Sequence, residues 1–197
     1  MPEPIKPSYS FRLVAGLVEG AMAVVAVALG WLLGVAPLES FAWSWGGLVA
    51  GGLATVPLLV LVAACARWPL GPLGRLMRVI DERLVPLFRD FSLLDLAALA
   101  VLAGLGEELL FRGVIQAAMS GAIGGGTGTL VGLAVAASLF GAAHWITAEY
   151  AALAGLIGLY LGAVWLWSGN LLAPMAAHAL YDFLVLVYLT RVRVPAP

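Results

Sequence analysis

Charged residues are scarce in this chain: Asp, Glu, Lys and Arg make up 11% of its 197 residues, against about 25% in an average soluble domain. Ten Lys and Arg are balanced by eleven Asp and Glu, so the chain lacks the basic excess typical of nucleic-acid-binding proteins. A single cysteine, Cys65, excludes an internal disulfide. These shortages exclude an ordinary soluble domain, a nucleic-acid partner and a disulfide-stapled fold.

Hydrophobic residues, in contrast, make up 63% of the chain, which is typical of an integral membrane protein. A helix that spans a membrane needs about 20 mostly apolar residues. Six stretches approach or exceed this length, at residues 13–35, 41–66, 92–119, 127–145, 150–167 and 171–189. The sequence therefore predicts an all-α fold, a polytopic transmembrane helical bundle of about six spans, with residues 1–197 as a single integral membrane domain.

The one strongly charged stretch, residues 67–90, lies between the second and third expected spans and contains five arginines. Within it, residues 75–88 place Leu76, Ile80 and Leu84 at helical spacing. A helix that is apolar on one face and charged on the other binds at the membrane surface. We therefore expect an amphipathic interfacial helix between the second and third spans.

Basic residues near the ends of the spans indicate the orientation. Lys6 and Arg12 precede the first span or open it, the arginines of residues 67–90 follow the second, and Arg191 and Arg193 follow the last. Cytoplasmic loops carry the excess of Lys and Arg in membrane proteins. We expect a multi-pass protein of a cell membrane, the bacterial cytoplasmic membrane, with both termini in the cytoplasm.

Glycines recur four residues apart in several spans, a spacing that lets helices approach closely in lipid. These pairs are Gly47/Gly51, Gly128/Gly132 and Gly158/Gly162. We expect them to pack within one bundle, and a dimer face is the alternative. The sequence predicts no oligomeric state.

Charged side chains inside a span are costly, and they usually face the protein interior or a water-filled cavity, where they mark function. The third span contains Glu107, Glu108 and Arg112. Glu108 and Arg112 are four residues apart on one helix face, so they can form an ion pair. Glu107 is rotated by about 100° from Glu108, and we expect it to be the freer carboxylate.

Both histidines of the chain, His144 and His178, also fall in expected spans. Phe140 precedes His144 by four residues and Asp182 follows His178 by four, so each pair projects from one helix face. The polar residues thus lie on three helices. Side chains that converge from facing helices form the catalytic and metal sites of helical bundles.

Three carboxylates against one arginine leave this cluster with excess negative charge when both histidines are neutral. A bound divalent cation, protonated histidines or a protonated carboxyl group would relieve it. Glu107, His144 and His178 could hold zinc or another divalent metal, which would acidify a bound water. A glutamate alone could instead act as a general base. Both chemistries describe a hydrolase that acts in the membrane.

Two further acids, Glu19 and Asp95, belong to no such set, and we expect them near the interface or as helix caps. The expected spans also conflict in depth. Drawn as straight rods, they place His144 near the cytoplasmic end and His178 about 10 Å from the opposite face. Either the fourth span extends past Trp145, or the helices tilt and break around a wet cavity.

The three motifs resemble those of the Abi or CPBP family of intramembrane proteases, which groups CAAX prenyl endopeptidases with bacteriocin-processing enzymes. The family pattern is a glutamate pair with an arginine four residues beyond the second, then phenylalanine and histidine four apart, then histidine with a polar residue four later. EELLFRG, FGAAH and HALYD supply these motifs in order. The resemblance covers residues 95–189, the expected protease core.

The resemblance implies an endopeptidase that hydrolyses a peptide bond of a membrane-associated, prenylated or bacteriocin-like substrate among membrane lipids. The catalytic residues it implies are Glu107, Glu108, Arg112, His144, His178 and Asp182, and we expect Phe140 to pack in or line the substrate pocket. Glu107 would activate the water, supported by Glu108 and Arg112, while the other polar residues would position it or stabilise the oxyanion. The family leaves metal dependence open.

Asp182 departs from the asparagine that prenyl-protein proteases usually have, so a prenylated substrate is not assured by the motif. Two other functions could use the same polar cluster. One is a non-catalytic membrane binding or bacteriocin-immunity protein, and the other is a proton or ion pathway, which would need a chain of polar groups across the membrane. A binder has no need of a water-activating carboxylate beside two imidazoles, so the sequence favours the protease.

Overall fold

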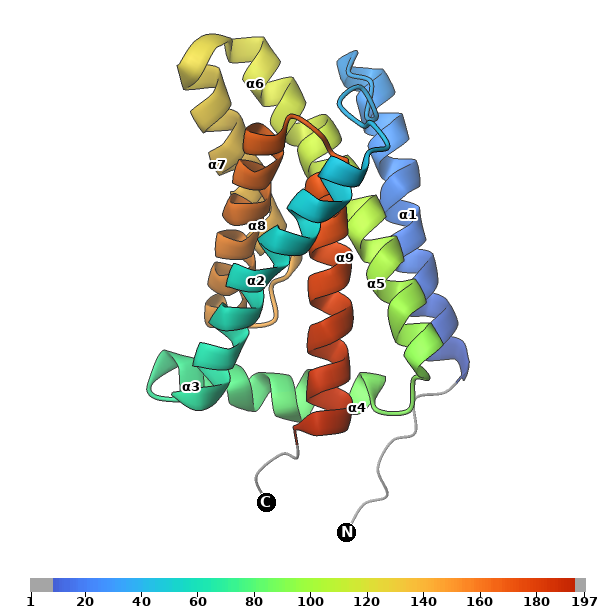
Figure 1. Ribbon diagram of the computed structural model, residues 1–197, viewed down its shortest axis with the longest axis vertical. Coiled ribbons are helices and arrows are strands. Elements are labelled where there is room, and N and C mark those ends of the chain that lie inside the picture. Colours follow the sequence, from blue (N-terminus) through green and yellow to red (C-terminus); the bar gives the residue numbers. More distant parts are fainter. Residues whose placement is uncertain (1–8, 194–197) are drawn as a thin grey trace.

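The computed structural model describes residues 9–193, so Lys6, one of the basic residues used for orientation, lies outside the described part. Every regular element within these residues is helical (Figure 1). In chain order the elements are α1 (Tyr9–Leu33), α2 (Trp45–Arg67), α3 (Pro72–Val79), η1 (Ile80–Leu84), α4 (Val85–Phe88), α5 (Leu93–Glu108), η2 (Leu109–Gln116), α6 (Ala117–Ile123), α7 (Gly125–Ala143), α8 (Ala148–Ser168), α9 (Leu172–Val187) and η3 (Tyr188–Val192), where η denotes a π-helical segment. The expected all-α fold is confirmed.

Five helices in the described part are long and apolar enough to cross a membrane: α1, α2, α7, α8, and α9 together with η3. The sixth expected span, residues 92–119, is helical from Leu93 onward and runs from α5 through η2 into α6. It is richer in charge than the other five because it carries Asp95, Glu107, Glu108 and Arg112. The protein is therefore a multi-pass membrane protein.

Helix α9 lies in the middle of the bundle (Figure 1), with α2 and α5 packed against it. Helix α1 packs on α5 and η2, and α7 packs on α8, α6 and η2. The segment η2, which carries Arg112, is therefore in contact with α1, α7 and α8. This arrangement brings the three motif-bearing helices to one place.

Helix boundaries follow from capping residues. The Ser44 side chain accepts a hydrogen bond at the start of α2, and Thr147 does the same for α8. Ser92 and Asp95 form a reciprocal capping box at the start of α5, so the capping role expected for Asp95 is confirmed. Gly169 ends α8 in a left-handed conformation that suits glycine.

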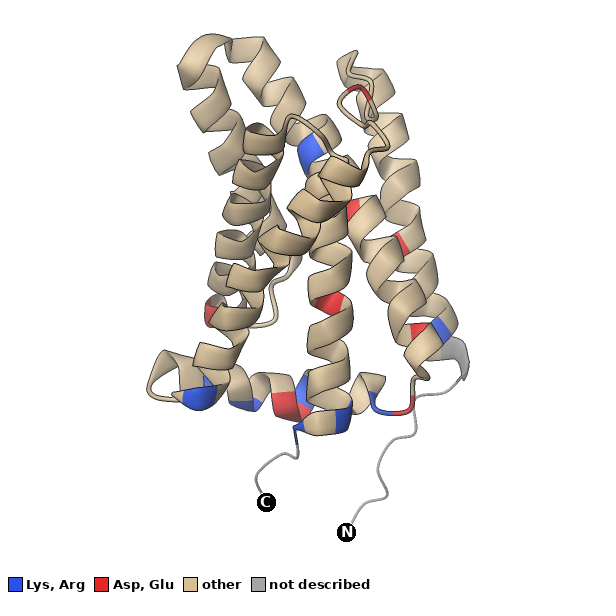
Figure 2. Ribbon diagram, in the orientation of Figure 1, with Lys and Arg blue, Asp and Glu red and all other residues tan. Residues whose placement is uncertain are grey.

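The segment from α3 to α4 crosses one end of the bundle, where most of the arginines of the chain gather (Figures 1 and 2). It buries Leu76, Met77 and Val85 against the bundle. Arg75 pairs with Glu149 of α8 at 2.7 Å, and Asp81 pairs with Arg193 at 2.8 Å. The expected amphipathic segment is thus present, and it closes this end of the bundle.

The paired glycines pack inside the bundle, as expected. A Cβ atom on Gly51 would lie 2.6 Å from the Cβ atom of Ala176 in α9. A Cβ atom on Gly132 would lie 2.7 Å from the carbonyl oxygen of Gln116. Because these distances leave no room for a methyl group, glycine is what permits the helices to approach so closely.

The conflict in depth between the two histidines is resolved by the position of α7. Helix α7 ends at Ala143, so the fourth span does not extend past Trp145. Instead, the hairpin of α6 and α7 rises beyond the connection between α8 and α9 (Figure 1). Near the end of α7, the ring of Phe140 consequently lies with its centre 5.9 Å from that of His178 in α9.

Candidate active site

A buried ion pair lies at the junction of α5 and η2. Glu108 and Arg112 have fully buried side chains, and Oε1 of Glu108 accepts a hydrogen bond from Nη1 of Arg112 at 2.8 Å. The pair follows from the spacing of four residues, as expected. The π-helical turn that contains Arg112 has a geometry that recurs at functional sites.

Arg112 also connects its helix to α8 and α7. Its Nη2 donates to the carbonyl oxygen of Gly158 at 2.6 Å, and its guanidinium carbon lies 4.9 Å from the centre of the Phe140 ring. A Cβ atom on residue 158 would lie 3.1 Å from Phe140. Glycine at this position therefore lets the carbonyl group come within reach of Arg112.

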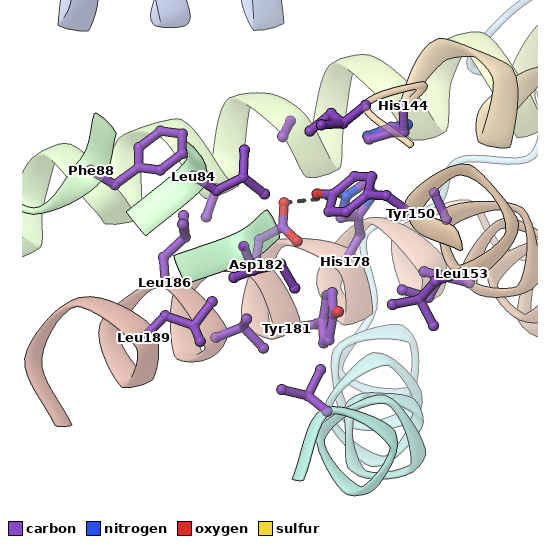
Figure 3. A pocket seen from close by; sticks show the side chains of 18 of the residues that line it. Leu84, Phe88, His144, Tyr150, Leu153, His178, Tyr181, Asp182, Leu186 and Leu189 are labelled. Carbon is purple, nitrogen blue, oxygen red and sulfur yellow. Dashed lines mark ion pairs between the residues drawn. The ribbon is translucent and has the colours of Figure 1, made fainter. Parts of the chain in front are cut away.

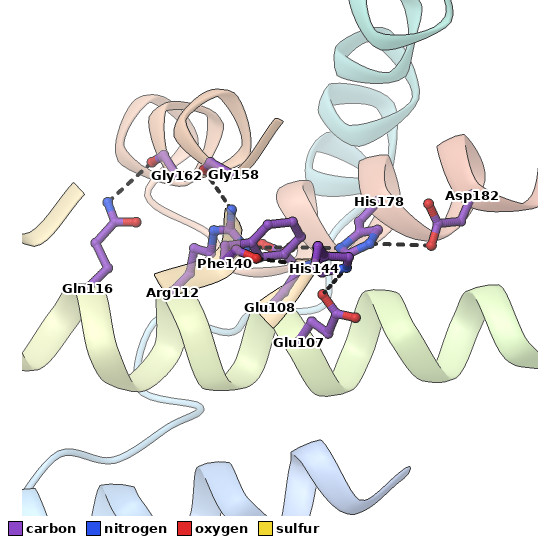
Figure 4. A network of polar contacts seen from close by, with 10 residues as sticks. All are labelled: Glu107, Glu108, Arg112, Gln116, Phe140, His144, Gly158, Gly162, His178 and Asp182. Atoms are coloured by element: carbon purple, nitrogen blue, oxygen red, sulfur yellow. Dashed lines mark hydrogen bonds and ion pairs between the residues drawn. The ribbon is translucent and has the colours of Figure 1, made fainter. Parts of the chain in front are cut away.

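His178 lies between two carboxyl groups (Figure 4). Its Nδ1 is 2.8 Å from Oε1 of Glu108, and its Nε2 is 3.4 Å from Oδ2 of Asp182. A carboxylate beside each ring nitrogen is best satisfied when both nitrogens carry a proton. The positive charges of Arg112 and His178 thus compensate the negative charges of Glu108 and Asp182.

His144 is held by the residue four positions before it. Its Nδ1 lies 2.9 Å from the carbonyl oxygen of Phe140, and the two rings stack with their centres 4.6 Å apart. Because Nδ1 donates to that carbonyl, Nε2 is the nitrogen left for other partners. It lies 3.7 Å from Oε2 of Glu107, a separation that a single water molecule can bridge.

Glu107 is the carboxylate of the three motifs that is left uncompensated. Its side chain is 7% exposed, and its Oε2 has no hydrogen-bond partner. A cavity of about 440 Å³ is lined by Glu107, His144, His178 and Asp182. Glu108 is not among its lining residues, so the two neighbouring glutamates differ as expected: one faces the cavity and the other is sealed in an ion-pair network.

The cavity has a polar end and an apolar end (Figure 3). His144, Tyr150 and His178 lie toward one end, Leu84, Phe88, Leu186 and Leu189 lie toward the other, and Asp182 lies between the two groups. The apolar end is formed in part by the interfacial segment from α3 to α4. Polar groups that could hydrolyse a bond therefore adjoin a space suited to an apolar chain.

Comparisons with known proteins match the part of the chain that carries these residues. A family model described as "Type II CAAX prenyl endopeptidase Rce1-like" matches residues 89–184, which hold all three motifs. These residues are therefore similar to the Rce1-like family. The resemblance to the CPBP family is thereby confirmed.

The chain is also similar to a Bacillus subtilis (strain 168) protein named "Uncharacterized protein YpbD", with 31% identity over 102 residues. The match covers 49% of this chain and 46% of the relative, so the chain spans about half the length of this curated relative. No solved structure matches the chain at a significant level.

The donor set of the Rce1-like segment does not fit the metal considered from the sequence. Catalytic zinc is held by three protein ligands, but both ring nitrogens of His178 are engaged with Glu108 and Asp182. This leaves Glu107 and Nε2 of His144. Within residues 9–193, no three His, Cys, Asp or Glu side chains are placed to hold a metal ion.

The expectation for Glu19 was wrong. This residue of α1 lines the same cavity as Glu107, and its Oε2 is buried without a hydrogen-bond partner. The sequence did hold a signal, because Glu19 is an isolated acid within a long apolar stretch. What it could not show is which helix α1 packs against. Tyr150, another residue of the polar end, carried no sequence signal.

Proposed function

We propose that the chain is an intramembrane endopeptidase in which Glu107 acts as the general base. The observation that carries this proposal is the position of Glu107, whose unpartnered Oε2 faces the cavity 3.7 Å from Nε2 of His144. A water between these two atoms would donate one hydrogen bond to each. Its oxygen lone pair would then point away from both, toward a substrate carbonyl carbon.

The reaction balances with these groups alone. Glu107 takes a proton from the water while the water oxygen bonds to the carbonyl carbon of the scissile peptide, and the π electron pair of the carbonyl group moves onto the carbonyl oxygen. The tetrahedral intermediate then collapses, the C–N bond breaks, and Glu107 gives its proton to the leaving nitrogen. The charge on His178, which lines the cavity, stabilises the oxyanion electrostatically.

The substrate in this proposal is a peptide or protein within the membrane. Its scissile bond lies at the polar end of the cavity, and an apolar side chain or attached lipid lies at the apolar end. Asp182 is paired with His178 and acts through it in this proposal. The start of α1 and the end of η3, with the interfacial segment, lie on the cytoplasmic side of the bacterial cell membrane in this proposal, because most of the arginines gather at that end (Figure 2).

The test is cleavage of a pool of quenched fluorescent peptides by the full chain in detergent micelles. The pool contains farnesylated CAAX-type peptides and unmodified apolar peptides. We expect the wild-type chain to cleave members of the pool and Glu107→Gln to lower kcat by about 10²–10⁴-fold, the contribution of general base catalysis. Glu39→Gln, a change at an exposed acid, should leave kcat unchanged.

A metal chelator should leave the wild-type rate unchanged, because Glu107 and His144 bind the water in the proposed step and no metal ion takes part. Loss of activity on chelation would contradict the metal-free step, and normal activity of Glu107→Gln would contradict the role of Glu107. A folded wild-type chain that binds peptides of the pool but cleaves none would instead favour the binding or immunity protein.

A further inference from the structure

The carboxyl group of Glu19 lies partway along α1 with its Oε2 buried, on a helix that contributes little else to the cavity. Glu19 is ten residues after the start of α1 at Tyr9, which places it about 15 Å along the helix. Arg12, near the start of α1, forms an ion pair with Asp95 at 3.1 Å. A carboxyl group at this depth needs a partner.

The backbone of α1 comes very close to α5 beside the proposed base. A Cβ atom on Gly106 would lie 2.6 Å from the carbonyl oxygen of Glu19 and 3.1 Å from the Cβ atom of Met22. Glycine at position 106 is therefore required for this contact. The contact places Glu19 next to the residue that follows Gly106, which is Glu107.

The two side chains meet in the cavity. Glu19 and Glu107 both line it, and the close approach of α1 to Gly106 brings the backbone of Glu19 against the helix that carries Glu107. The cations of the network are occupied elsewhere, because Arg112 is bound to Glu108 and Gly158, and His178 lies between Glu108 and Asp182. The partner that remains for Glu19 is therefore Glu107 itself.

We propose that Glu19 is a positioning residue: a hydrogen bond between its carboxyl group and that of Glu107 holds Oε2 of Glu107 toward His144 and the cavity. Two carboxyl groups in contact repel each other unless a proton lies between them. With that proton on Glu19, the bond is of the O–H···O⁻ kind, which is short and strong. The proton stays on Glu19, and Glu107 exchanges its own proton with water and the leaving nitrogen.

This inference rests on the proposed function, but it is not carried over from the Rce1-like family. The family match covers residues 89–184, and α1 lies outside it. The role of Glu19 follows from the packing of α1 on α5 in this chain. It would make the first helix part of the active site.

The experiment compares three variants of the full chain on a peptide that the wild-type chain cleaves. Glu19→Leu cannot donate a hydrogen bond, whereas the amide of Glu19→Gln can donate to Glu107 from nearly the same position. Glu39→Leu removes an exposed acid of the α1–α2 connection and is the matched control. Thermal unfolding of each variant in detergent reports on folding.

We expect Glu19→Leu to lower kcat by about tenfold to a hundredfold, as a misplaced catalytic group does, and to leave KM nearly unchanged. Glu19→Gln and Glu39→Leu should keep kcat near the wild-type value. If Glu19→Leu unfolds early, Glu19→Ala replaces it, and added acetate should restore kcat by occupying the space of the lost carboxyl group.

Equal kcat values for Glu19→Leu and the wild-type chain would overturn the inference and leave the proposed function standing. A Glu19→Gln variant as slow as Glu19→Leu would also overturn it, because Glu19 would then act by transferring its proton. A wild-type chain that hydrolyses no peptide would overturn the proposed function and this inference together.

Discussion

Replacing Arg112 with methionine tests how the polar network holds the bundle together. Arg112 is fully buried and makes three interactions: the ion pair with Glu108 at 2.8 Å, the hydrogen bond to the Gly158 carbonyl at 2.6 Å, and the contact over the Phe140 ring. Methionine preserves much of the apolar volume and removes the charge. The change leaves the Glu108 carboxylate with His178 as its remaining partner.

The expected cost follows from these contacts. A hydrogen bond from a charged donor contributes about 1.5–3 kcal/mol, and a desolvated cation–π contact contributes about 2 kcal/mol. Removing one partner of a buried ion pair costs about 3–5 kcal/mol, because the other buried charge loses a compensating partner. We therefore expect Arg112→Met to lower the free energy of unfolding by about 3–5 kcal/mol.

The assay is unfolding in mixed micelles with increasing SDS, followed by the fluorescence of the seven tryptophans. Measuring Arg112→Met, Glu108→Gln and the double variant gives a double-mutant cycle. The double variant should cost less than the two single variants together by about 1–3 kcal/mol, since both charges are then absent. Arg75→Met is the control, because the pair of Arg75 with Glu149 is partly exposed and contributes less than about 1 kcal/mol.

Additive effects to within about 0.5 kcal/mol would refute the coupling. A cost for Arg112→Met no greater than that for Arg75→Met would refute the larger conclusion, that this buried pair holds α5, η2 and α8 together. Both results would be decisive even in a chain without detectable hydrolysis, because stability is measured without a substrate.

Two further predictions concern packing and capping. Gly51→Ala should lower the free energy of unfolding by about 1–3 kcal/mol, because the added methyl group would lie 2.6 Å from Ala176. Gly52→Ala is the control and should be neutral or slightly stabilising, because no atom lies within 4 Å of its Cβ position. Equal effects of the two substitutions in the same SDS titration would contradict the close approach of α2 and α9. Asp95→Ala should cost about 1 kcal/mol through loss of the capping box at α5 and of the partly exposed pair with Arg12, and an unchanged SDS midpoint would contradict both contributions.

Much of the candidate site was predictable because its pairs are local. The spacing of four residues within one helix was enough to pair Glu108 with Arg112, to place Phe140 beside His144, and to leave Glu107 as the freer acid. These relations depend on helical geometry alone. Helix type and approximate span positions were predictable for the same reason, since apolar length determines them.

Relations between helices were not predictable from the sequence. The finding that the available side chains do not fit a zinc site depends on the contact of His178 in α9 with Glu108 in α5. The depth of His144 depends on how far the α6–α7 hairpin rises, which no local pattern records. Glu19, expected at an interface, lies in the cavity because Gly106 lets α1 approach α5 closely.

The sequence by itself determined the all-α membrane class, the amphipathic segment and the three polar motifs, because each depends on the length or the period of a single helix. The tertiary structure alone decided which polar groups meet across helices: it places His178 between two carboxylates, and it places Glu107 and Glu19 in the lining of one cavity. The physical reason is that contacts between helices in a bilayer depend on close packing at small residues such as Gly51 and Gly106. Apolar patterning brings a helix into the membrane but does not choose its neighbour.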